Sequence, residues 1–101
     1  MSQWADDIGS EKCYVYEIVN TINFKRYIGI TSRLDERYKE HMVGTGSSLV
    51  FKAVKKYGKE NFQYNVLFQS NREECLEKEI ELIKTKNTIQ PYGYNISKGG
   101  Y

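Results

Sequence analysis

The 101-residue chain is poor in cysteine and proline and has no long hydrophobic run. Its two cysteines, Cys13 and Cys75, have no close-spaced partner, so neither a metal knuckle nor a disulfide framework is expected. The first residues carry no basic start, and no stretch reaches the roughly 20 apolar residues of a membrane-spanning helix. We therefore expect a reduced, cytoplasmic protein with no membrane association.

What remains is an ordinary globular composition. Hydrophobic residues make up 40% of the chain and charged residues 28%, which argues against disorder. A chain of this length forms one small domain, and no internal repeat or linker divides it. Aromatic residues, at 14%, supply large side chains for a single compact core.

The net charge of +2 hides an uneven distribution. Residues 25–60 hold nine Lys or Arg and four Asp or Glu, whereas the remainder holds six and nine. A basic middle is typical of a domain that binds a polyanion on one side. Lysine-rich helical faces exposed to water explain the same pattern equally well.

The apolar pattern predicts three strands and three helices. Strands are expected at 13–19, 26–31 and 62–68, the first two forming an antiparallel hairpin around a turn at 20–23. Helices are expected between and after them, in the order β-β-α-α-β-α. The fold class is α+β, a small, mostly antiparallel three-stranded sheet flanked by helices.

Capping residues set the expected helix ends. Ser32, with Asp35 three residues later, opens the first helix, and Gly44 and Gly46 break it. Ser47 or Ser48 caps the second helix, which Gly58 ends. Asn71 caps the third helix, which should end near Asn87 before a turn at Pro91 and Gly93.

Glu79 is the sharpest anomaly of the third helix. It lies in the middle of an apolar stripe, at offsets −4, −3, +3 and +4 from Cys75, Leu76, Leu82 and Ile83. A carboxylate there is costly unless it is paired or bound to a metal. The alternative is that Glu79 lies at the edge of the stripe and reaches water.

Two further groups could carry chemistry. Arg37 and His41 lie one turn apart on the first helix, where an arginine can bind a phosphate and a histidine can transfer a proton. Tyr14, Tyr16 and Tyr27 are concentrated on the two strands of the hairpin. Tyrosine on a strand is usually packing, and a phenol acts as a base only where cations stabilise its phenolate.

These residues together resemble a known family. Tyr14-Val15-Tyr16 followed by Tyr27-Ile28-Gly29 resembles the paired motif of the GIY-YIG nucleases, with Tyr16 and Tyr27 as the two signature tyrosines. The likeness extends to three later residues, Arg37, His41 and Glu79, and to the closing Gly93-Tyr94-Asn95. It is nearest to the catalytic domains of phage-type homing endonucleases. Tyr14 replaces the leading glycine, and a histidine that some members carry before the second helix is missing, so its role is either absent or taken by Ser47 or Ser48.

The resemblance implies a domain arrangement and an activity. Residues 13–96 would be the catalytic domain, with an N-terminal extension at 1–12 and a tail at 97–101. The activity would be hydrolysis of DNA phosphodiester bonds with one Mg²⁺ or Mn²⁺ held by Glu79. Arg37 would bind the scissile phosphate, and Tyr16 would be the general base, with His41 as the other candidate.

The resemblance also assigns supporting roles and partners. Tyr27 would position water or phosphate, His41 would assist proton transfer, and Asn95 would fix local geometry. Double-stranded DNA would be the partner of a monomer or transient dimer in a bacterial or phage-infected cell. Backbone phosphates are expected to contact a basic set of Arg26, Lys52, Lys55, Lys56 and Lys59. The alternative function is a nucleic-acid-binding or regulatory module derived from a nuclease.

Overall fold

The computed structural model describes residues 12–43 and 48–99. Several sequence predictions fall outside this part of the chain. They are nearly all of the N-terminal extension at 1–12, the helix break at Gly44 and Gly46, the Ser47 cap, and the end of the tail at 97–101.

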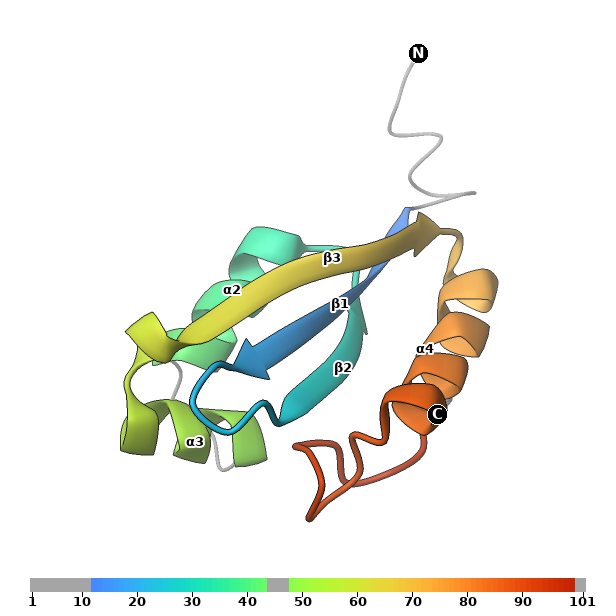
Figure 1. Ribbon diagram of the computed structural model, residues 1–101. Helices are drawn as coiled ribbons and strands as arrows, with labels where there is room; N and C mark the ends of the chain where they lie inside the picture. Colours follow the sequence, from blue (N-terminus) through green and yellow to red (C-terminus); the bar gives the residue numbers. More distant parts are fainter. Residues whose placement is uncertain (1–11, 44–47, 100–101) are drawn as a thin grey trace.

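The core of the fold is a three-stranded antiparallel sheet in the order β2-β1-β3 (Figure 1). Its strands are β1 (Cys13–Asn20), β2 (Arg26–Thr31) and β3 (Phe62–Ser70). The pairing of β1 with β3 shifts register between Val15 and Tyr16, where Leu67 is left without a partner. The central strand is β1, so its side chains are covered on both faces, and residues 15–20 are all buried.

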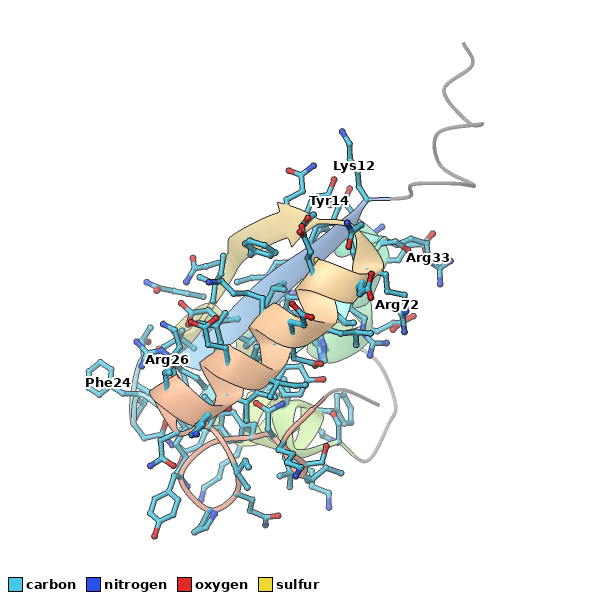
Figure 2. All side chains as sticks on the ribbon, turned by 90° about the vertical axis from the view of Figure 1, so that its right-hand side faces the viewer. Lys12, Tyr14, Phe24, Arg26, Arg33 and Arg72 are labelled. Atoms are coloured by element: carbon cyan, nitrogen blue, oxygen red, sulfur yellow. The ribbon has the colours of Figure 1, made fainter. Side chains whose placement is uncertain are left out.

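Helices cover both faces of the sheet. The helices are α2 (Leu34–Val43), α3 (Leu49–Tyr57), the short η1 (Lys59–Asn61) and α4 (Arg72–Lys86). Tyr16 and Ile18 of β1 pack with α2 and α3, whereas Cys13 and Val15 pack with α4. Figure 2 looks onto α4, with the sheet behind it. The predicted α+β fold and its element order are therefore confirmed.

Most helix ends follow the predicted caps. The Ser48 side chain accepts a hydrogen bond from the Phe51 amide at 3.1 Å, and Asn71 accepts one from Glu74 at 2.8 Å. Gly58 ends α3 with φ of 93°, a backbone conformation that suits glycine. Asn87 ends α4 in the left-handed conformation.

One local prediction is wrong. α2 begins at Leu34, one residue later than a cap at Ser32 requires, and the Arg33 carbonyl accepts from the Arg37 amide at 3.0 Å. Ile80, another apolar residue of α4, is 41% exposed. The α4 residues buried against the sheet are Cys75, Glu79 and Ile83, which lie four apart and so occupy one narrow face.

The segment after α4 closes the outer edge of β2. The Asn95 side chain accepts a hydrogen bond from the Ile28 amide and donates one to the Ile28 carbonyl, both at 2.9 Å. The amide of Tyr94 donates to the Arg26 carbonyl at 2.8 Å. A side-chain amide thus takes the place that a fourth strand would have beside β2.

In the described residues, the helices are all too short or too polar to cross a membrane.

Candidate active site

Tyr16 lies at the centre of the sheet and is fully buried. Its partner on β2 is Gly29, and a Cβ built on Gly29 would lie 2.5 Å from the Tyr16 hydroxyl and 2.8 Å from Cε2 of Tyr27. The space above Gly29 is therefore filled by the two tyrosine side chains. This close approach explains why the second motif of the hairpin ends in glycine.

Two side chains from α2 meet the Tyr16 hydroxyl. His41 Nε2 lies 2.8 Å from it, and Nε of Arg37 donates to it at 3.4 Å. Because an arginine can only donate, the Tyr16 oxygen accepts from Arg37, and its own O–H remains free to donate to His41. The spacing of four between Arg37 and His41 places both on the face of α2 that meets the sheet.

The environment favours the neutral forms of Tyr16 and His41. Burial, together with the positive charge of Arg37, lowers the pKa of His41 to about 4. Burial also raises the pKa of Tyr16 above its usual value, and Arg37 only partly opposes that rise. At neutral pH the Tyr16 hydroxyl is therefore protonated, and the Nε2 atom of His41 beside it is unprotonated and can accept its hydrogen bond.

Arg37 combines access to solvent with a fixed position. It is half-buried, and its Nη1 contacts Oε1 of Glu40 at 2.8 Å. Its hydrogen bond to the Tyr16 hydroxyl, assisted by Glu40, raises the pKa of its guanidinium. The cation is thus permanent and held at the edge of the tyrosine cluster.

Tyrosine rings surround the Tyr16–His41 pair. The Tyr27 ring packs against both members, with centroids 6.1 Å from Tyr16 and 5.2 Å from His41. On the other side, Tyr64 of β3 lies 5.1 Å from Tyr16, and its hydroxyl donates to the Leu34 carbonyl at the start of α2. Tyr64 lies within the predicted third strand, but its contact with Tyr16 could not be predicted, because the register between β3 and β1 is a tertiary property.

Glu79 is 4% exposed, so the alternative that it reaches water from the edge of its stripe is wrong. It takes its position from α4, one turn from Cys75 on one side and from Ile83 on the other. A Cβ on Gly99 would lie 3.2 Å from its Oε1, so the chain after α4 passes over the carboxylate. Residues 12–43 and 48–99 contain no cluster of three or more acidic, His or Cys side chains that could hold a metal alone.

Asn95 is buried at the edge of the sheet rather than among the tyrosines. Besides bonding both backbone groups of Ile28, it accepts a hydrogen bond from the Thr88 hydroxyl at 2.7 Å. Ile28 lies directly between Tyr27 and Gly29. Asn95 thus fixes the strand that carries the second tyrosine.

The predicted basic set divides into separate groups. Arg26 pairs with the buried carboxylate of Glu17, their atoms 3.3 Å apart. Lys52 and Lys56 line a cavity beside α3, which Lys25 of the β1–β2 turn also lines. Lys55 lies over the Phe51 ring instead, and Lys59 is exposed on η1. Sequence reasoning missed Lys25, because nothing in a turn sequence shows which helix it faces.

Comparison with known families accounts for this arrangement. Residues 12–95 match the GIY-YIG catalytic domain family, which covers both motif strands, α2, α4 and Asn95. The chain belongs to the GIY-YIG family. The resemblance stated from the sequence is confirmed.

Phage proteins and a homing endonuclease are among the relatives of this GIY-YIG chain. It is 36% identical over 90 residues to segD of enterobacteria phage T4, and 35% identical over 88 residues to endonuclease segA of the same phage. These matches cover 88% and 86% of the chain but only 39% and 38% of the relatives, so the chain spans about two fifths of their length.

The fold of this GIY-YIG chain also matches solved structures. The catalytic domain of the homing endonuclease I-TevI superposes with a TM-score of 0.71 at 28% identity, covering 84% of this chain and 98% of that domain. A mutant of that domain superposes with a TM-score of 0.74, covering 87% of this chain and 96% of that domain.

Proposed function

We propose that this GIY-YIG domain is a divalent-metal-dependent endonuclease that hydrolyses phosphodiester bonds of double-stranded DNA. The observation that carries the proposal is the Arg37–Tyr16–His41 hydrogen-bonded group. It joins a permanent cation to a hydroxyl and a neutral imidazole within 3.4 Å. The names of the relatives, endonuclease segA and homing endonuclease I-TevI, support the same reaction class.

Proton transfer is the step for which Tyr16 and His41 are arranged. An attacking water gives its proton to the Tyr16 oxygen, and the hydroxyl proton of Tyr16 passes to Nε2 of His41. Imidazolium forms and no free phenolate need accumulate, which agrees with the raised pKa of Tyr16. Tyr16 is then the proton relay, and His41 is the final acceptor. Because Tyr16 is fully buried, binding of DNA must open its oxygen to the attacking water.

Arg37 supplies the positive charge for the phosphate. Its side chain is 43% exposed, so a phosphodiester can approach it from solvent. The salt bridge to Glu40 leaves further donors of the guanidinium fork for phosphate oxygens. Charge that develops on the phosphate in the transition state would be stabilised by this fixed cation.

Glu79 is the residue proposed to hold the metal. A single buried carboxylate suits Mg²⁺ or Mn²⁺, because such ions take most of their ligands from water and from substrate phosphates. A cation bound there would stabilise charge on the phosphate and on the leaving 3′ oxygen. Asn95 and Tyr27 would support the geometry around the reacting phosphate, through β2 and through the Tyr16–His41 pair respectively.

The experiment is cleavage of supercoiled plasmid with Mg²⁺ and then with a chelator. Glu79→Ala and Arg37→Ala should each lose on the order of a thousandfold in rate, equivalent to about 4 kcal/mol of transition-state stabilisation. Glu77→Ala, exposed on α4, and Arg33→Ala, exposed directly before α2, are the matched controls. Cleavage that survives the chelator or Glu79→Ala refutes the metal site, and no nicking with any divalent ion favours a binding module.

One active site cuts one strand, so a monomer is expected to produce nicked circles before linear DNA. Second-strand cleavage would require a second encounter or a transient dimer. The phage relatives would place this activity in the cytoplasm of an infected cell.

A further inference from the structure

We infer that a groove beside α3, lined by Lys25, Lys52 and Lys56, holds the backbone of the DNA at a point away from the scissile phosphate. The inference rests on the proposed function, because it takes DNA to be the substrate. It divides the basic set predicted from the sequence into residues that share one binding surface and residues that do not.

Three segments far apart in the sequence build this groove. They are the β1–β2 turn, one face of α3 and the chain from residue 90 to 94, which meet below the sheet in Figure 1. The cavity has a volume of about 270 Å³. Apolar side chains of α3 and the ring of Tyr94 form part of its lining, and two amides, Asn23 and Gln90, add hydrogen-bond donors.

The groove is positively charged and has no internal compensation. Its lining contains three lysines and no acidic residue among the described positions. Within residues 12–43 and 48–99, none of the three lysines forms an ion pair, although Lys56 lies 5.3 Å from the centroid of the Tyr57 ring. An anion bound there would lie near three positive charges. A nucleic-acid strand carries regularly spaced negative charges on its phosphodiester backbone, so it can contact all three lysines.

The geometry separates this groove from the reacting group. Val50 and Val54 of α3 pack in the cluster that contains Tyr16, whereas Lys52 and Lys56 of the same helix face the groove. Tyr94 contacts both the groove and the cluster around Tyr16: it lines the first and packs against the second. Its hydroxyl also accepts a hydrogen bond from the Asn20 side chain at 3.0 Å. A strand held in the groove would therefore be anchored to the same packed layer as Tyr16 without touching it.

The chain offers a closely matched pair of variants. Lys52→Gln with Lys56→Gln removes two charges four residues apart that line the groove. Lys55→Gln with Lys59→Gln removes two charges at the same spacing that do not line it. All four lysines are exposed, so neither double variant is expected to disturb folding, which circular dichroism checks.

The measurement is the affinity for a fluorescently labelled duplex in chelator, as a function of salt. Each lost phosphate contact lowers the slope of log K against log salt by about 0.9. The loss of two contacts therefore reduces the change in affinity between about 50 and 200 mM salt by about 12-fold, and Lys25→Gln in addition brings the reduction to about 40-fold. The Lys55 and Lys59 double variant should keep the wild-type slope.

The inference is refuted if the two double variants have equal slopes of log K against log salt. It is also refuted if the Lys52 and Lys56 double variant keeps the wild-type slope. Binding in chelator needs no cleavage, so the result is independent of the proposed reaction. In the cleavage assay, the groove variant should raise KM far more than it lowers kcat. A protein that binds through the groove but never nicks DNA would refute the proposed function and leave this inference standing.

Discussion

Lowering the pH should destabilise the domain through His41. This imidazole is 7% exposed and hydrogen-bonded to Tyr16, and the folded state lowers its pKa from 6.5 to about 4. The unfolded chain therefore takes up a proton near pH 6.5, and the folded chain takes it up only near pH 4. The stability that His41 contributes is complete above pH 6.5 and is lost as the pH falls from about 6.5 to about 4.

The size of this effect follows from the two pKa values. A gap of about 2.5 between them corresponds to about 3 kcal/mol of unfolding free energy, at about 1.4 kcal/mol for each pKa unit. Titration of both states predicts that about 2 kcal/mol of this is already lost between pH 7 and about pH 4.5. That is a large share of the 5–15 kcal/mol, roughly, that stabilises a typical domain.

Urea unfolding at the two pH values measures the loss, with far-UV circular dichroism as the signal. His41→Gln is the comparison, because its amide oxygen can accept the Tyr16 proton and does not titrate. Carboxylates titrate in both proteins, so the difference between them isolates His41. The wild type should lose about 2 kcal/mol more than the variant, and equal losses would refute the assignment of a neutral, buried His41.

Three other outcomes are expected. Gly29→Ala brings a methyl within 2.5 Å of the Tyr16 hydroxyl, so plasmid cleavage should fall by about tenfold or more with the fold retained, and wild-type cleavage would mean that the ring has room to move. Asn95→Ala leaves the buried amide and carbonyl of Ile28 without their partner, so the free energy of unfolding measured in urea should fall by about 2–4 kcal/mol. A fall below about 0.5 kcal/mol would show that water replaces the side chain. Because His41 is neutral above about pH 4, kcat should not fall with a midpoint near pH 6.5 as the pH is lowered, and such a midpoint would assign the titration to an exposed imidazole.

The elements of the fold could be predicted because local chemistry specifies them. Ser48 and Asn71 cap helices whose apolar spacing is visible in the sequence, and the alternation from Phe62 to Phe68 marks a strand. The alternation does not give one buried face, because the register shift at Leu67 intervenes. Phe62 and Tyr64 pack with the Tyr16 cluster, Val66 is 49% exposed, and Phe68 packs with the Cys13 cluster on the other side of the sheet. The start of α2 lies one residue beyond the position that Ser32 and Asp35 predict, because the first backbone bond of the helix runs from the Arg37 amide to the Arg33 carbonyl. Register with β1, which fixes Tyr16 opposite Gly29, is a tertiary property.

The site was predictable only as far as residue types and helical spacing reach. The spacing of Arg37 and His41 gives a shared face, but it does not show that both side chains converge on Tyr16, 21 and 25 residues earlier. The raised pKa of Tyr16 also runs against the sequence expectation, in which cations favour a phenolate. Burial in the sheet outweighs the neighbouring Arg37, and the extent of burial cannot be read from a strand sequence.

The hydrogen bonds of Asn95 also bear on what the sheet can pair with. A sheet this small has two edge strands, and an open edge is a template for pairing with another chain. On β2 the outward amide and carbonyl of Ile28 are occupied by Asn95, so that edge offers no continuous ladder. On β3 the register shift at Leu67 interrupts the ladder from the inner side and bends the strand. The sheet is therefore guarded against edge-to-edge aggregation by one side-chain amide at one edge and one unpaired residue at the other.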